Sequence, residues 1–236
     1  MIKAVLFDLD GTLLPMEQDV FVKDYFGRMA KRLAPLGFEP GGFVDAIWSG
    51  MGAMVKNDGA VTNEARFMES FERVYGERTP VAIAELDRFY HEEFDLVRES
   101  CGFDPEAKEA VDALRLMGCR LVLATNPIFP RIATEKRAGW AGLAPSDFEF
   151  ITTYEDWGHC KPNTDYYRDI LARLNLSPED CIMVGNDALE DMVAGTIGLD
   201  TFLIPRNLLN RKGCDISAYK QGSLSDLVEY IKTQNS

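Results

Sequence analysis

The first residues of the chain that could do chemistry are two carboxylates in the stretch VLFDLDGTLL near the N-terminus. Val5, Leu6 and Phe7 are typical of a buried strand, and Asp8 and Asp10 follow with one residue between them. Side chains two positions apart on a strand point to the same face, so we expect the carboxylates to lie side by side where the strand ends. Because like charges repel and burial disfavours each charged form, the pair indicates a functional role.

Three further groups of polar residues follow apolar runs that predict strands. They are Thr125 and Asn126 after RLVLA, Lys161 in the loop after FEFITT, and Asn186 and Asp187 after CIMVG, with Glu190 and Asp191 close behind. The carboxyl ends of parallel strands meet at one edge of a sheet, where open α/β folds bind their ligands. We therefore expect these groups, which are far apart in sequence, to converge on Asp8 and Asp10.

The elements that must position these residues alternate between strands and helices. After the first strand, further strands are predicted at 120–125, 148–153, 181–185 and 201–204, and helices at 105–117, 164–174, 188–197 and 224–233. Such alternation is typical of a doubly wound, mostly parallel, Rossmann-like α/β sheet. We expect residues 1–15 and 100–236 to form this discontinuous core.

Residues 16–99 interrupt the core with a segment that has helical periodicity and little strand signal. Apolar residues recur at spacings of three and four over 21–36 and over 81–97, as in amphipathic helices. Between them, 48–60 is rich in Gly and Met and predicts a mobile loop or a broken helix; its Met51 fits core packing and a substrate-facing surface equally well. Because the segment begins just after the first strand, we expect it to form a helical cap over the site.

Composition narrows the class of partner. The 236 residues carry a net charge of −13, which disfavours binding to nucleic acid or to an anionic membrane surface. No apolar run is long enough for a membrane span, and the N-terminus lacks the pattern of a signal peptide. The five cysteines are scattered and form no CxxC pair, which favours reduced thiols and a cytoplasmic location.

Taken together and in this order, the four polar groups resemble the motifs of the haloacid dehalogenase-like superfamily, whose members are mostly phosphatases. DxDGT after an apolar strand is highly specific, whereas a Thr that ends a strand, a Lys before Pro, and an acidic cluster after Gly gain weight only in combination. The resemblance covers nearly the whole chain. The position of the helical segment matches the branch of the superfamily that has a cap inserted after motif one, the DxDGT segment.

The resemblance implies a Mg²⁺-dependent phosphatase that acts on a small phosphorylated metabolite. Asp8 would bind the metal and attack phosphorus, giving an aspartyl-phosphate. Asp10 would offer its backbone carbonyl to the metal, and its carboxyl would serve as general acid and base. Thr125 and Asn126 would donate hydrogen bonds to the phosphoryl group, and Lys161 would neutralise charge on that group and on Asp8.

The last of the four motifs, the acidic cluster after Gly185, is called motif four. It departs from its commonest form, in which an Asp that binds the metal directly follows the Gly. Here Asn186 holds that place and Asp187 comes next. Either side chain could ligate Mg²⁺ through oxygen, and we expect Asp187 to supply the charge with Asn186 close behind. Asp191 could instead act through water or orient Lys161.

Several alternatives share parts of this pattern. A phosphomutase would use the same residues but return the phosphoryl group to a sugar phosphate. A 2-haloacid dehalogenase would share the nucleophile but need neither Mg²⁺ nor a second Asp, so Asp10 and the acidic motif disfavour it. A non-catalytic binding protein ranks low because every catalytic position is filled. A receiver domain is disfavoured because its phosphoaccepting Asp lies on an internal strand and it has no large cap. The sequence predicts neither the physiological substrate nor the oligomeric state.

Overall fold

A single parallel sheet organises the computed structural model, which describes all 236 residues. Its strands lie in the order β3-β2-β1-β4-β5-β6, and every neighbouring pair is parallel. They are β1 Ala4–Phe7, β2 Arg120–Leu123, β3 Phe150–Ile151, β4 Cys181–Gly185, β5 Asp200–Leu203 and β6 Lys220–Gln221. The predicted α/β class and parallel sheet are confirmed.

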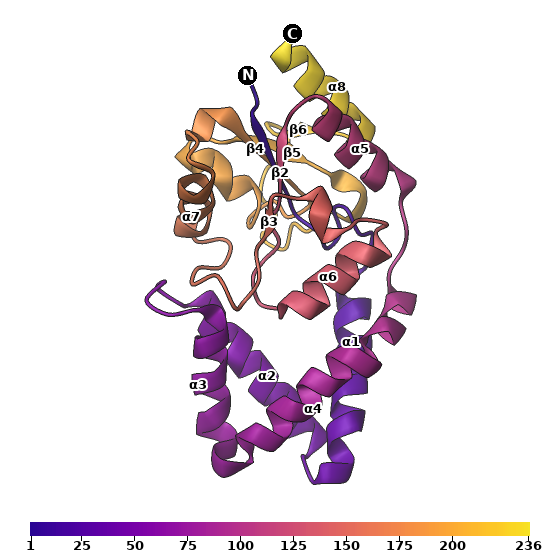
Figure 1. Cartoon of the computed structure of the whole chain (residues 1–236), viewed down its shortest axis with the longest axis vertical. Coiled ribbons are helices and arrows are strands. Elements are labelled where there is room, and N and C mark those ends of the chain that lie inside the picture. The colour runs from indigo at the N-terminus through magenta and orange to yellow at the C-terminus, as the bar shows by residue number, and fades with distance from the viewer.

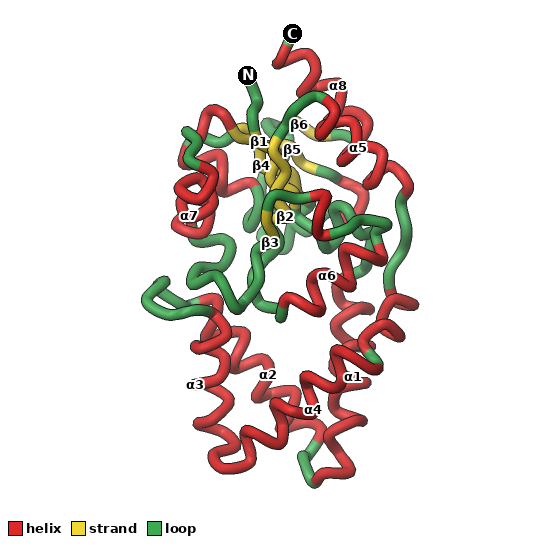
Figure 2. The backbone as a smooth tube through the Cα atoms, in the orientation of Figure 1, coloured by secondary structure: helices red, strands yellow, loops and turns green.

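Eight α-helices accompany the sheet. They are α1 Gln18–Leu33, α2 Pro40–Val55, α3 Asn63–Tyr75, α4 Thr79–Glu92, α5 Pro105–Leu116, α6 Arg131–Trp140, α7 Thr164–Leu174 and α8 Leu224–Asn235. Helices α1 to α4 come between β1 and β2 in sequence and lie at the end of the molecule opposite the two termini (Figure 1). All the strands lie in the other half (Figure 2). No helix is both long enough and apolar enough to span a membrane.

The central strand β1 contributes to two separate apolar cores because its side chains alternate between the faces of the sheet. Val5 and Phe7 belong to the larger core, which also holds residues of α5 and α8 and of the helices that follow β1. Ala4 and Leu6 belong to the smaller core, with residues of α7. Burial on both faces explains the continuous apolar run before Asp8.

The loop predicted within 48–60 is wrong for residues 48–55, which continue helix α2. The helix begins with Pro40, and the Glu39 carboxylate accepts hydrogen bonds from two backbone N–H groups of its first turn. Gly50 allows α3 to pack closely, since a Cβ there would lie 2.5 Å from the Phe67 ring. The glycines thus reflect helix–helix packing and not a break.

The helix predicted over 188–197 is also different, because only the 3₁₀ helix Met192–Ile197 forms. Asp187 Oδ1 accepts hydrogen bonds from the N–H groups of Leu189 and Glu190, and Asp191 Oδ2 accepts one from the N–H of Asp187. These side-chain bonds compete with those of an α-helix. The two-residue strand β6 was not predicted, since it is exposed and has no apolar pattern.

Helix α3 is tied to the sheet-containing half through its first residue, Asn63. The Asn63 N–H donates to the Trp157 carbonyl (2.7 Å), and Asn63 Nδ2 donates to the Pro127 carbonyl (3.1 Å). Asn57 Nδ2 in turn donates to Asn63 Oδ1 (2.9 Å), and the Asn63 side chain is fully buried. The helical segment is therefore attached to the rest of the chain at a point remote in sequence from its two ends.

We expect Asn63→Ala to lower the free energy of unfolding by about 1–3 kcal/mol, because it leaves buried polar partners without a hydrogen bond. Urea unfolding at 25 °C would measure this change. The exposed Glu72 on the same helix offers a control, since Glu72→Ala removes no buried contact. A change for Asn63→Ala within about 0.5 kcal/mol, as for an ordinary surface position, would contradict this role.

Candidate active site

Asp8 and Asp10 follow the end of β1 but differ in their backbone: the Asp8 N–H still donates to the Val184 carbonyl of the neighbouring strand (2.9 Å), whereas Asp10 lies in a tight turn. Strand β1 ends at Phe7, and the N–H groups of Thr12 and Leu14 both donate to the carbonyl of Leu9. Gly11 makes this turn possible with a φ of +86°. The two carboxylates line the same cavity but bind different cations.

Asp8 contacts the ammonium of Lys161, which is almost completely buried. Lys161 Nζ donates to Asp8 Oδ1 (2.8 Å) and to Asp191 Oδ1 (2.7 Å). Burial alone would lower the pKa of Lys161, but the carboxylates of Asp191 and Asp8 outweigh it and hold the pKa well above its ordinary value. Lys161 is therefore a fixed positive charge beside Asp8.

Thr12 joins Asp8 to motif four. Its hydroxyl lies 3.3 Å from Asp8 Oδ2 and 3.2 Å from Asn186 Oδ1, while Asn186 Nδ2 donates to the Asn207 carbonyl (2.6 Å). A Cβ at Gly11 would lie 2.2 Å from Asn186 Nδ2, so only glycine permits this approach. The amide oxygen of Asn186 and Oδ2 of Asp8 thus lie on either side of the same hydroxyl.

Asp187 and Glu190 line the same cavity with different partners. One carboxylate oxygen of Asp187 is engaged by two backbone N–H groups, and Glu190 Oε2 accepts a hydrogen bond from Asn126 Nδ2 (3.0 Å). Burial raises the pKa of Glu190 to about 7; Lys161 opposes this rise, and Asp187 adds to it.

Two segments next to the cavity that holds Asp8 carry hydrogen-bond donors without a partner in the chain. The Thr125 hydroxyl and the backbone N–H of Asn126 donate no hydrogen bond within the chain, and neither do the N–H groups of Leu9 and Asp10. Thr125 is itself fixed through its carbonyl, which accepts bonds from the Thr152 and Tyr166 hydroxyls. Such fixed, unpaired donors suit an anionic group.

Asp10 binds Arg137, a residue that the sequence reasoning missed. The Arg137 guanidinium forms an ion pair with Asp10 Oδ2, is fully buried and stacks 4.0 Å from the centre of the Phe129 ring. Asp10 Oδ1 is buried without a hydrogen-bond partner. Burial raises the pKa of Asp10, the guanidinium of Arg137 opposes this rise, and the charge of Asp8 adds to it.

A cavity of 640 Å³ brings the predicted site residues together. Asp8, Asp10, Thr125, Asn126, Asn186 and Asp187 all line it, whereas Lys161 lies behind Asp8. No three His, Cys, Asp or Glu side chains are grouped as a metal site. The oxygens around Asp8 nevertheless suit Mg²⁺, which takes one or two carboxylates and completes its octahedron with neutral oxygens, substrate and water.

The chain matches the family model of haloacid dehalogenase-like hydrolases over residues 2–196 and belongs to that family. Ribulose-1,5-bisphosphate 5-phosphatase of Halopiger xanaduensis is 30% identical over 217 residues, covering 86% of this chain and 84% of that protein. Glyceraldehyde 3-phosphate phosphatase of Methanothermobacter thermautotrophicus is 25% identical, covering 92% and 95%. The structure of a 2-haloacid dehalogenase from Pseudomonas syringae pv. Tomato superimposes with a TM-score of 0.67 at 22% identity, covering 99% and 100%, which supports the fold alone.

Proposed function

We propose that the protein is a Mg²⁺-dependent phosphomonoesterase that hydrolyses a small phosphorylated metabolite through an aspartyl-phosphate on Asp8. The observation that carries this proposal is the position of Asp8. One of its oxygens is held by Lys161, and Asp8 lines a cavity whose wall also includes Thr125 and Asn126 with their unused donors. Membership of the hydrolase family and the phosphatases among its relatives support the same reaction.

The chain's own residues account for two steps, transfer of the phosphoryl group to Asp8 and hydrolysis of the aspartyl-phosphate. Asp8 attacks phosphorus, the bond to the ester oxygen breaks, and Asp10 gives its proton to the departing alkoxide. Asp10 then takes a proton from the water that attacks the aspartyl-phosphate, which releases phosphate and restores Asp8. Thr125, Asn126 and Lys161 stabilise the phosphoryl oxygens throughout.

The metal would be held by Asp8, by the backbone carbonyl of Asp10 and by a side chain of motif four, and when bound it would offset the charge of the phosphate ester. We infer that Asn186 is better placed than Asp187 for this position. Its Oδ1 shares the Thr12 hydroxyl with Asp8 Oδ2, whereas one oxygen of Asp187 already accepts two backbone hydrogen bonds.

Residues 16–99 are proposed to act as a cap over this site, with 1–15 and 100–236 as the catalytic core. Helices α1 and α2 support this division because both contribute side chains to the cavity that holds Asp8. The five unpaired cysteines, three of them buried, support a reducing compartment such as the cytoplasm.

Phosphate release from a panel of phosphorylated metabolites with Mg²⁺ tests the proposal. We expect release that stops when EDTA removes the metal and returns when Mg²⁺ is restored. Isomerisation of a sugar phosphate without net release would identify a phosphomutase instead. Chloride release from a 2-haloacid without any metal would overturn the proposal in favour of a dehalogenase.

Arg137 is proposed as a positioning residue for Asp10. We expect Arg137→Met to lower kcat on an alkyl phosphate about 100-fold, because an alkoxide needs the proton that Asp10 delivers. The loss should be much smaller on p-nitrophenyl phosphate, whose leaving group departs without a proton. Steady-state rates on both esters measure the difference.

Two comparisons separate this role from a merely structural one. Arg137→Lys keeps a cation beside Asp10 and should recover part of the rate on the alkyl ester. The exposed Arg88, which pairs only with Glu85, gives a control in Arg88→Met. Equal losses on both esters in Arg137→Met would show that Arg137 does not act through Asp10.

A further inference from the structure

A second, largely apolar cavity adjoins the catalytic one. It has a volume of 240 Å³, and 13 of its 16 lining residues are hydrophobic. Its walls come from α1 to α4 and from the segment after β2, and four residues line both cavities: Tyr25, Met51, Ile128 and Phe129. Met51, for which the sequence left core and substrate-facing roles open, is thus at the junction. The two cavities therefore share part of their lining.

The polar groups around the second cavity disfavour an anionic occupant. Glu64 and Asp87 are the only charged residues that line it, and both are acidic. Burial raises the pKa of Glu64, with Glu155 and Asp156 adding to the rise. A carboxylate or a second phosphate placed here would meet negative charge and no cation.

The cavity is also poorly suited to a sugar. The hydroxyls of Tyr25 and Tyr90, on facing walls, bond to each other and so are less available to a ligand. Both tyrosines belong to a cluster of rings that includes Phe129 and Phe94. A polyol would lose hydrogen bonds to water on entering such a space and could regain them only from the side chains of Glu64, Asp87 and Tyr154.

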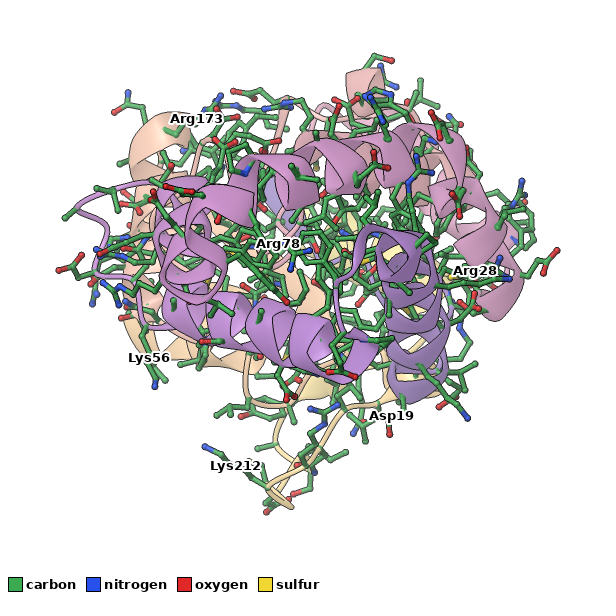
Figure 3. The ribbon with its side chains drawn as sticks, turned by 90° about the horizontal axis from the view of Figure 1, so that it is seen from below. Asp19, Arg28, Lys56, Arg78, Arg173 and Lys212 are labelled. Carbon is green, nitrogen blue, oxygen red and sulfur yellow. The ribbon has the colours of Figure 1, made fainter.

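The cations of this region lie on the outer side of the catalytic cavity instead. Lys56, Arg211 and Lys212 line that cavity and are exposed, and Arg211 bonds to Gln18. Lys56, Asp19 and Lys212 lie along one side of the molecule, with their side chains pointing outward (Figure 3). Cationic side chains therefore line the catalytic cavity, whereas the apolar cavity has none in its lining.

We propose that the apolar cavity binds the organic part of the substrate, so that the preferred substrate is the phosphate monoester of an apolar alcohol with no second anionic group. This inference rests on the proposed phosphatase function. The space is sufficient, since an apolar cavity of about 150 Å³ in another protein binds benzene. A short alkyl chain or a single aromatic ring is the size of group that fits.

Binding of alkylphosphonates, which are not hydrolysed, tests the ligand class without requiring turnover. With Mg²⁺ present, calorimetry should show that affinity rises about fourfold per methylene from methyl to hexyl, until the cavity is full. A hexylphosphonate with a terminal carboxylate should bind more weakly than hexylphosphonate. Equal affinity for methyl- and hexylphosphonate, or tighter binding of the carboxylate analogue, would overturn the proposal.

Filling the cavity should remove the preference. Ile83 on α4 lines it, and Val81 on the same helix is 51% exposed. Ile83→Trp should reduce the hexyl-to-methyl affinity ratio at least tenfold, whereas Val81→Trp should keep it. If Ile83→Trp does not show wild-type thermal unfolding, Met68→Trp on α3 repeats the test. An unchanged ratio in a folded cavity variant contradicts the assignment.

Hydrolysis provides a separate result. The kcat/KM for hexyl phosphate should exceed that for a hexose 6-phosphate of similar length. If the phosphonates show the chain-length effect but no ester is hydrolysed, the proposed function fails and the assignment of the cavity stands. If esters are hydrolysed but the hexose 6-phosphate is preferred, the apolar substrate class fails and the phosphatase stands.

Discussion

Replacing Asp8 by Asn is expected to reduce kcat on any phosphate ester by about 10⁴–10⁶-fold, the range observed when an enzyme loses its nucleophile or a partner of it. An amide oxygen is a poor nucleophile, and the substitution also removes a negative ligand for the metal. The fold should be retained, because Asn has nearly the same shape and can still accept the hydrogen bond from Lys161 that Asp8 now accepts at 2.8 Å. Phosphate release at saturating Mg²⁺ and thermal unfolding measure the two effects.

Asp45 on α2 offers a matched control for this experiment. It is exposed and makes no ion pair, so Asp45→Asn changes the same functional group without touching the site. We expect wild-type rates from the control. Wild-type rates from Asp8→Asn at saturating Mg²⁺ would disprove the proposed mechanism.

Replacing Lys161 by Met is expected to lower both activity and stability. The catalytic loss should be about 100- to 1,000-fold, because a fixed donor beside the nucleophile disappears. The free energy of unfolding at neutral pH should fall by about 3–5 kcal/mol, because Asp8 and Asp191 remain buried without their cation. Steady-state kinetics and urea unfolding at several pH values measure these effects.

The stability loss in Lys161→Met should depend on pH in a definite direction. Burial already raises the pKa of Asp191 to about 7 while Lys161 opposes the rise, and removing Lys161 raises it further. A carboxyl whose pKa is higher in the folded than in the unfolded state stabilises folding only when protonated. The loss should therefore be largest above pH 7 and diminish toward the unfolded-state pKa of about 4.

A second substitution separates the two effects of Lys161. Adding Asp191→Asn to Lys161→Met removes one stranded carboxylate and should restore much of the stability but not the activity. Recovery of activity along with stability would show that Lys161 has only a structural role. Lys23→Met on α1, an exposed position without an ion pair, controls for the change of residue type.

The convergence of Asp8, Thr125 and Asn186 could be predicted because each directly follows an apolar run. The carboxyl ends of parallel strands fix where such residues meet, whereas the order of the strands in the sheet was not predicted. The first and last residues of the helices between β1 and β2 were harder to predict. Gly50 looked like a helix breaker, yet it is needed for the approach of Phe67, which depends on a neighbour that no local pattern reveals.

The partners of the catalytic carboxylates were less predictable for a related reason. Arg137 lies in the sequence TEKRAGW, where a charged residue on a helix usually faces solvent. Its burial depends on Asp10 and Phe129, which are remote in sequence. Asp191 was recognised as part of the acidic cluster, and its contact with Lys161 was one of two roles considered. The turn that contains Asp10 was also not evident, because strand periodicity does not capture the two backbone hydrogen bonds that the Leu9 carbonyl accepts.

Trapping of the phosphoryl group on the protein tests the central claim most directly. A radiolabelled phosphate ester would be mixed with the Mg²⁺-loaded enzyme, quenched in acid within the first turnover, and digested for peptide mapping. We predict label on the peptide that contains Asp8, at the carboxylate of Asp8, and none in Asp8→Asn. Label on another residue, or release of alcohol and phosphate in step with no protein-bound label at any time, would contradict the account.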